Sequence, residues 1–237
     1  LHWVYDPKKL KKYIKGKKEI AFLNDRAVTF LAKWHHHAAG SSSHIHQSLR
    51  SADGKAVFFD PAQPHGMSQM MQSYLAGLLT YADDTTYFLA PYVNSYKRFM
   101  AGTFAPTKAI WSIDNRTAGY RVVAENSQNI RVECRVGGSD LNPYLALAGQ
   151  LAAGLKGIED HLTLEAEFCG DAYQADAARA IPASLREATL ALDGSDMLRA
   201  AMGDAVIDHY VRAARWEQED FDSKVTDYEV RRGFERA

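Results

Sequence analysis

The chain has 237 residues and a formal net charge of −1, because 28 Lys and Arg offset 29 Asp and Glu. Hydrophobic residues make up 46% of it and charged residues 24%, as in globular proteins with a full core. The near-zero charge argues against a nucleic-acid-binding protein. No apolar run approaches the roughly 20 residues of a membrane span, and Cys134 and Cys169 form no CxxC motif. We expect a reduced, cytoplasmic protein with no membrane or nucleic-acid partner.

The first half of the chain alternates between short periodic segments and loops. Asp6 and Pro7 favour the start of a helix that runs to about Leu23. The β-branched and aromatic residues of 26–34 predict a strand, and a second strand is expected at 44–49. A helix should follow from Met67 to about Ala82, and the proline- and glycine-containing stretch 91–115 is loop-like.

Strands precede helices in the second half. The segments 119–125 and 129–136 alternate as strands do, and Asn142-Pro143 opens a helix to about Leu162. From Leu164 onward the chain is expected to be helical. No internal repeat or long linker divides the chain, so residues 1–237 are predicted to form one α+β domain. Its curved antiparallel sheet would pack against helices.

Two histidines share a face of the second predicted strand. His44 and His46 lie two residues apart, so both imidazoles project into one space. Neutral imidazole is a common metal ligand, although a bare HxH pair is more often an ordinary surface or core feature. Such a pair is also found in metal-dependent amidohydrolases, but the strand-end histidines and alternating barrel of that class are missing here.

Arginines are concentrated between residues 98 and 135. Arg131, Glu133 and Arg135 alternate along one predicted strand and therefore share a face. Cross-strand ion pairs would explain any one of these residues. The whole series, which few carboxylates accompany, instead favours a cationic pocket for carboxylates or phosphates. Glu133 within it could bind Mg²⁺ or Mn²⁺. The arginines of the series are Arg98, Arg116, Arg121, Arg131 and Arg135.

Five sequence blocks resemble, in their order, the catalytic half of the glutamine synthetase family. They are GSSSHIHQSL (40–49), VNSYKRFMAGTFAP (93–106), DNRTAGYRV (114–122), RVECRV (131–136) and NPYLALAGQLAAGLKGI (142–158). Together they span about 120 residues, and the ordered set is far more specific than any single block. The resemblance implies the fold of a glutamine synthetase-type catalytic domain.

The resemblance also implies a role for each matched residue. His44 and Glu133 match metal ligands, and Arg116 matches the arginine that touches both glutamate and the transferring phosphate. Positions that bind L-glutamate are matched by Gly40, Arg98, Arg116 and Arg135. Positions that bind ATP are matched by His46, Ser48, Arg121 and Arg131.

One position departs from the family pattern. Phe104 stands just before Ala105-Pro106, where glutamine synthetases carry a glutamate that helps deprotonate ammonium. Phenylalanine cannot accept a proton, whereas its aromatic face attracts an alkylammonium by about 0.5–2 kcal/mol. The pattern therefore resembles the γ-glutamylmethylamide synthetase branch of glutamate–amine ligases. Tyr96 and Trp111 could extend an aromatic box, although packing in the core is their more ordinary use.

The expected reaction is the ATP- and Mg²⁺-dependent ligation of methylamine or another small alkylamine to the γ-carboxylate of L-glutamate, through a γ-glutamyl phosphate. The resemblance further implies a ring-shaped homo-oligomer, such as a dodecamer, with active sites between subunits. The family's N-terminal β-grasp domain and its paired metal-binding glutamates find no match in residues 1–237. We therefore expect these residues to be the catalytic half of a longer protein.

Two alternative functions remain open from the sequence. The protein could be an ammonia-using glutamine synthetase. It could also be an inactive scaffold or binding protein that keeps the family's fold without a complete metal site. A preference for ammonium over alkylamines would distinguish the first alternative from the expected ligase. A lack of ADP release with any amine would distinguish the second.

Overall fold

The computed structural model describes residues 7–236, with the backbone alone for residues 7–14. The helices are α1 (Pro7–Leu23), α2 (Gln69–Thr80), α3 (Ala82–Leu89), α4 (Val93–Tyr96), α5 (Pro143–Glu159), α6 (Leu185–Asp193), α7 (Asp196–Met202), α8 (Asp204–Asp222) and α9 (Asp227–Glu235). Short 3₁₀ turns are η1 (Pro64–Gly66) and η2 (Ala172–Gln174), and the strands are β1 (Ile45–Gln47), β2 (Trp111–Ile113), β3 (Tyr120–Val123) and β4 (Arg131–Cys134). The predicted α+β class is confirmed.

The four strands form one sheet in the order β1-β4-β3-β2. β4 pairs antiparallel with both β1 and β3, as the sequence predicts. The prediction of a wholly antiparallel sheet is wrong at one edge, because β2 runs parallel to β3. The chain reaches this parallel register through the turn at 114–119, which leads it back beside the start of β2 before β3 begins.

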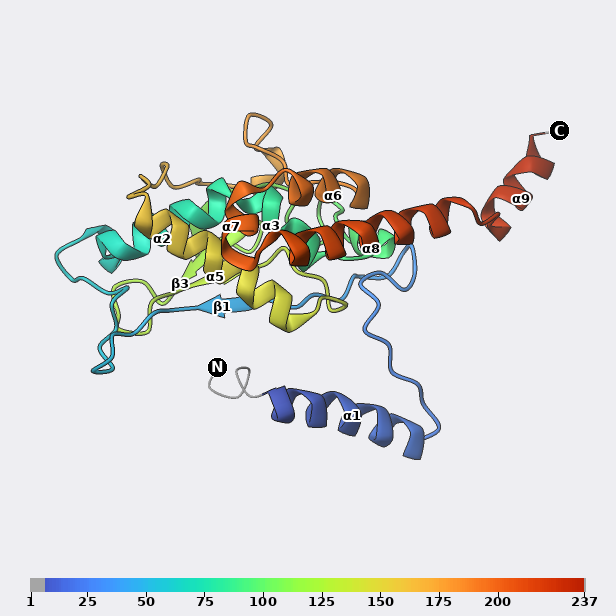
Figure 1. The fold of residues 1–237 in the computed structure, drawn as a ribbon, viewed down its shortest axis with the longest axis horizontal. Coiled ribbons are helices and arrows are strands. Elements are labelled where there is room, and N and C mark those ends of the chain that lie inside the picture. Colours follow the sequence, from blue (N-terminus) through green and yellow to red (C-terminus); the bar gives the residue numbers. More distant parts are fainter. Residues whose placement is uncertain (1–6, 237) are drawn as a thin grey trace.

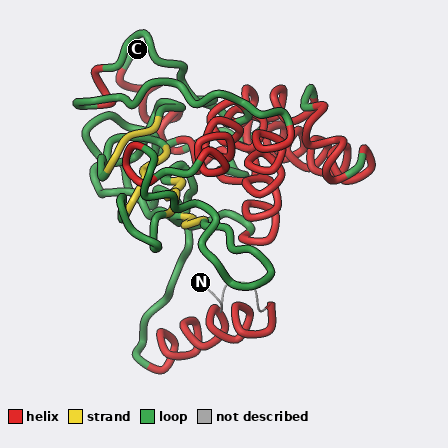
Figure 2. Tube along the Cα trace, turned by 90° about the vertical axis from the view of Figure 1, so that its left-hand side faces the viewer, coloured by secondary structure: helices red, strands yellow, loops and turns green. Residues whose placement is uncertain are grey.

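One face of the sheet packs against the helices, and the other carries polar side chains. Alternate residues of β3 and β4, Tyr120, Val122, Val132 and Cys134, are buried in the hydrophobic core. α2, α3 and α5 contribute the helical side of that core. Figure 2 shows the strands gathered on one side of the molecule and most helices on the other. The residues of β3 and β4 that alternate with the core set therefore line the opposite face.

Three segments differ from their predicted structure. Residues 26–34 form no strand. At Lys33 a side chain takes the hydrogen bonds that a partner strand would take: Oδ1 of Asn94 accepts from the Lys33 amide at 2.9 Å, and Nδ2 of Asn94 donates to the Lys33 carbonyl at 2.8 Å. The predicted loop 91–115 contains α4 and β2, which are too short to show a period. Residues 161–184 are mostly irregular rather than helical, and regular helix resumes at Leu185.

Two terminal helices extend away from the body. α1 follows the predicted helix from Pro7 to Leu23, while Asp6, its predicted cap, lies outside the described residues. Figure 1 shows α1 lying apart from the packed body at the end of an extended segment, and α9 projecting beyond α8. α9 is amphipathic and leaves Tyr228 and Phe234 exposed. None of the helices within residues 7–236 combines the length and apolar character needed to cross a membrane.

α2 and α5 approach each other more closely than ordinary side chains allow. A Cβ on Gly77 would lie 2.2 Å from the Ala153 carbonyl oxygen and 2.8 Å from the Gly157 Cα. These contacts are with backbone, which cannot rotate away. Replacing Gly77 with Ala should therefore overpack the helix pair and lower the free energy of unfolding by about 3 kcal/mol.

Urea denaturation followed by circular dichroism measures this effect. Gly16→Ala is the matched control, since a Cβ on Gly16 in α1 would meet no atom within 4 Å. That control should leave stability unchanged or slightly raised, because Ala favours helix more than Gly does. Equal stability of the two variants would contradict close packing of α2 on α5.

Candidate functional site

A row of polar residues crosses three neighbouring strands. His46 on β1 is paired with Glu133 on β4, and Glu133 is paired with Arg121 on β3. Residues in register on adjacent strands point to the same face, and Arg131 and Arg135 join them because they lie two residues from Glu133. The alternating sequence thus brings an imidazole, a carboxylate and three guanidiniums onto the polar face of the sheet.

Glu133 lies at the centre of this row. The Nδ1 of His44 is 2.8 Å from its Oε1, and the Nε2 of His46 is 3.6 Å from the same oxygen. Arg135 donates to Oε1 and Arg121 to Oε2, each at 3.1 Å. His44 immediately precedes β1, yet both imidazoles converge on one carboxylate, which confirms the geometry predicted from the HxH spacing.

These contacts set the charges of the group. Burial raises the pKa of Glu133, but the hydrogen bond from His44 and the charge of Arg135 outweigh it and lower that pKa to about 2. Burial, with the charge of Arg131, lowers the pKa of His46 more than the Glu133 carboxylate raises it. The Nε of Arg131 donates to Nδ1 of His46 at 3.2 Å, so the neutral ring carries its proton on Nε2. Three arginines outnumber the two carboxylates of the group, Glu133 and the exposed Asp114, which leaves the group net positive and suited to anions.

Arg98 is a buried cation next to this group. Its side chain is 3% exposed, and one guanidinium nitrogen donates to the Val136 carbonyl. Its Nε has no hydrogen-bond partner among the described residues. Burial lowers the pKa of Arg98 to about 10, so the group still carries its charge at neutral pH. A buried charge is costly unless an anion meets it, which suits Arg98 to a substrate carboxylate.

Gly40 packs directly on Arg98. A Cβ at this position would lie 2.4 Å from Cγ of Arg98 and 3.0 Å from the carbonyl oxygen of Ala32. The missing side chain therefore makes room for the stem of the arginine. The structure brings together these two residues, which are 58 positions apart in the chain and which the family resemblance assigns to glutamate binding.

The remaining predicted residues lie in loops next to the strands or to Arg98 in the chain. Arg116 is exposed in the turn before β3, and its carbonyl accepts from Nε of Arg135 at 3.2 Å. Ser48 is exposed just after β1. Phe104 is 61% exposed on the loop that follows Arg98, and its φ of 55° is in the left-handed region.

The two aromatic residues considered for a box around the amine lie in the hydrophobic core instead. Trp111 and Tyr96 are 5% and 8% exposed and belong to the hydrophobic core. The Nε1 of Trp111 donates to the Glu165 carbonyl at 3.0 Å. Their packing role is confirmed, and Phe104 remains the exposed aromatic residue among the three.

The side chains of this group supply only some of the ligands that a divalent cation needs. A carboxylate and an imidazole are ligands that Mg²⁺ or Mn²⁺ accepts, and His44 and Glu133 present them side by side. Among the described side chains, no three His, Cys, Asp or Glu residues are grouped to hold a metal ion. The pair can therefore supply part of a coordination sphere and does not close one.

Two residues near the site escaped the sequence analysis. Asp114 accepts from Arg121 at 2.8 Å and lies within a sequence block that was used only for its arginines. Tyr173, in η2, donates its hydroxyl to the Ala105 carbonyl at 3.2 Å. The segment around Tyr173 has no periodicity, so the sequence offers no signal that it returns to the Phe104 loop.

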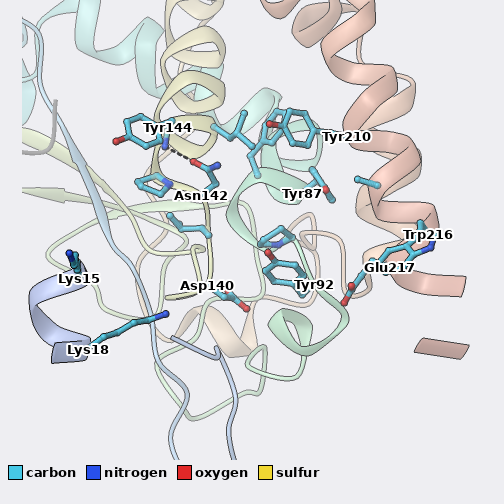
Figure 3. Close-up of a pocket in the computed structure, with 16 residues that line it drawn as sticks. Lys15, Lys18, Tyr87, Tyr92, Asp140, Asn142, Tyr144, Tyr210, Trp216 and Glu217 are labelled. Atoms are coloured by element: carbon cyan, nitrogen blue, oxygen red, sulfur yellow. Dashed lines mark hydrogen bonds between the residues drawn. The ribbon is translucent and has the colours of Figure 1, made fainter. Parts of the chain in front are cut away.

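A large cavity of the described chain lies elsewhere. It has a volume of about 1060 Å³ and is bordered by α1, the start of α5 and α8. Figure 3 shows Lys15 and Lys18 on one side of it and Trp216 and Glu217 on the other. None of the predicted site residues lines it. The volume of a cavity therefore does not locate the candidate site. The charged side chains and the register of β1, β4 and β3 locate it instead.

Comparison with known proteins gives a consistent set of matches. A family model described as glutamine synthetase, catalytic domain, matches residues 9–233. The gamma-glutamylethanolamide synthetase of Streptomyces coelicolor is 46% identical over 224 residues, covering 94% of this chain and 47% of that protein. The glutamate–isopropylamine ligase of a Pseudomonas species is 36% identical, covering 92% and 48%. A type-1 glutamine synthetase of Dictyostelium discoideum is 37% identical, covering 92% and 43%.

A solved structure shares the fold. Apo GmaS without ligand superimposes with a TM-score of 0.84 at 30% sequence identity, covering 94% of this chain and 52% of that one. The chain spans about half the length of the curated relatives it matches.

Proposed function

The chain belongs to the glutamine synthetase family, and from this premise we propose that its protein is an ATP-dependent glutamate–amine ligase for a small alkylamine. The observation that carries the proposal is the net-positive group around Glu133, with the buried cation Arg98 beside it. Such a group suits two anions that must meet, a substrate carboxylate and a phosphate chain. The relatives that act on ethanolamine and isopropylamine support the alkylamine part of the proposal.

The proposal assigns the anions to different arginines. Arg121 and Arg131 face the nucleotide phosphates together with His46 and Ser48, and Arg116 serves both substrates. Gly40, Arg98, Arg116 and Arg135 hold L-glutamate. The supporting contacts are those of Glu133, which aligns Arg121 and Arg135, and of Gly40 against Arg98.

The proposed reaction has two steps. An oxygen of the glutamate γ-carboxylate attacks the γ-phosphorus of ATP, which forms γ-glutamyl phosphate and releases ADP. The bound alkylammonium first loses a proton to solvent. The neutral amine nitrogen then attacks the acyl carbon, and the leaving phosphate takes up the second proton as the γ-glutamylamide forms. The arginines neutralise the transferring phosphoryl group and the charge of the tetrahedral adduct. Bound Mg²⁺ or Mn²⁺, with His44 and Glu133 among its ligands, would supply further charge neutralisation.

Phe104 is proposed to select the amine. Its ring is exposed on the loop beside Arg98 and carries no proton acceptor. An aromatic face attracts an alkylated ammonium through apolar contact and its quadrupole, whereas ammonium gains little apolar contact. A glutamate at this position would instead favour the smaller cation and help to deprotonate it.

Phe104→Glu should shift amine preference toward ammonium by about tenfold, as the ratio of kcat/KM for ammonium to that for ethanolamine. The full-length protein is assayed for ADP release with glutamate and each amine, including methylamine and isopropylamine. Phe104→Leu is the matched control: it keeps an apolar side chain but loses the aromatic face, and should weaken alkylamine use without improving ammonium use. An unchanged ratio in Phe104→Glu would show that Phe104 does not select the amine.

The same assay tests the alternatives. Equal or better kcat/KM with ammonium in the unmodified protein would replace the proposal by an ammonia-using glutamine synthetase, a function that the Dictyostelium relative carries in its name. No ADP release with any amine would favour an inactive scaffold.

The assembly and setting of the protein are part of the proposal. We infer a ring-shaped homo-oligomer, such as a dodecamer, in which residues 1–237 form the catalytic domain and further parts of a longer protein complete the metal site. Exposed apolar side chains on α1 and α9, such as Phe22 and Phe234, are of the kind that a subunit interface covers. Light scattering on the full-length protein tests the assembly. A cytoplasmic location stays a prediction.

A further inference from the structure

Tyr173 connects two loops that border the candidate site. Its hydroxyl donates to the carbonyl of Ala105 at 3.2 Å, one residue beyond Phe104. Its own amide donates to Oδ1 of Asp171 at 3.0 Å, which fixes the start of η2. Ala105 is buried, so the carbonyl that Tyr173 contacts is a fixed point of the loop that presents Phe104.

The segment around Tyr173 is held to the Arg116 turn on its other side. The amide of Ala172 donates to Oγ1 of Thr117 at 2.9 Å, and Nδ2 of Asn115 donates to the Gly170 carbonyl at 2.8 Å. Asn115 and Thr117 are the two neighbours of Arg116. The phenol therefore ends a chain of contacts that runs from the Arg116 turn to the Phe104 loop.

The Phe104 loop needs such a restraint. Gly102 and Phe104 both adopt left-handed backbone conformations, with φ of 77° and 55°. A phenylalanine persists in that region only where its surroundings enforce it. Burial and the charge of Asp171 raise the pKa of Tyr173 more than Arg135 and Arg98 lower it, so the hydroxyl keeps its proton at neutral pH and can donate to the Ala105 carbonyl.

We propose that Tyr173 is a positioning residue for amine selection, which holds Phe104 over the amine site through its hydrogen bond to the Ala105 carbonyl. This inference rests on the proposed ligase function for its kinetic consequence, but not for the tether itself. The tether predicts that loss of the hydroxyl loosens the Phe104 loop and weakens amine use, with little effect on ATP.

Tyr173→Phe in the full-length protein removes only the hydroxyl. Hydrogen–deuterium exchange should become faster in peptides that cover residues 100–106, and KM for ethanolamine should rise about 3- to 10-fold, as expected for the loss of one neutral hydrogen bond. KM for ATP should stay within about twofold. Tyr144→Phe, at an exposed tyrosine of α5, is the matched control and should change neither quantity.

A double-mutant cycle separates positioning from general damage. If Tyr173 acts through Phe104, adding Tyr173→Phe to Phe104→Ala should leave KM for the amine unchanged, since no ring remains to be positioned. An equal rise of KM for all three substrates, or full additivity in the cycle, would overturn the proposal. Unchanged exchange in residues 100–106 would overturn it as well. If the unmodified protein releases no ADP with any amine, the ligase proposal fails and the exchange measurement alone decides on the tether.

Discussion

Glu133→Ala is expected to lower the free energy of unfolding by about 3–5 kcal/mol and ligase activity by about 10²-fold or more. The side chain of Glu133 is 4% exposed and contacts two arginines and two histidines. Removing it leaves the nearly buried Arg135 without its carboxylate, beside a second guanidinium from Arg121. Urea denaturation measures the first effect and ADP release the second.

Two further variants show that the charge of Glu133 causes the loss. Glu133→Asp keeps the carboxylate and should retain most of the stability, while its shorter side chain still impairs activity. Glu19→Ala removes one partner of an exposed ion pair, Lys15–Glu19, and should leave stability unchanged because water already screens that pair. If Glu133→Ala unfolds at the same urea concentration as the unmodified protein, the carboxylate does not organise the arginines.

Gly40→Ala should raise KM for glutamate by about 100-fold, because a displacement of roughly 1 Å at a binding group can cost that much. The added Cβ would lie 2.4 Å from Cγ and 2.9 Å from Cδ of Arg98. These atoms belong to the buried stem of the side chain rather than to its free end, so the guanidinium must move with them. KM for ATP should change far less, since Arg98 has no assigned part in nucleotide binding.

A control at another glycine removes the general effect of an added methyl group. Gly233→Ala lies in α9, where a Cβ would meet no atom within 4 Å, and KM for glutamate should be unchanged. The comparison is made on initial rates at saturating ATP and amine. If Gly40→Ala and Gly233→Ala give the same KM for glutamate, the contact between Gly40 and Arg98 does not position the substrate.

The longer elements followed from local sequence alone. α2 and α5 are fixed by apolar periodicity together with capping residues, since Ser68 and Asn142 accept hydrogen bonds from the first turns of their helices. β3 and β4 follow from alternation, because one face of each strand is buried. Elements such as β2 and α4 are too short for any period, and contacts with distant segments decide their structure.

The sequence by itself determined that His44 and His46 project together, that Arg131, Glu133 and Arg135 share a strand face, and that five ordered blocks match one family. A period of two residues along a strand is enough for the first two inferences. Register across strands was decided only by the tertiary structure, which places Glu133 between His46 and Arg121.

The contact between Gly40 and Arg98, and that between Tyr173 and the Phe104 loop, were also shown only by the tertiary structure. The physical reason is that contacts between segments far apart in the chain depend on how the whole core packs, whereas periodicity reports only on neighbours within one element. The composition shows only that the chain is nearly neutral, whereas the fold brings its arginines together around Glu133.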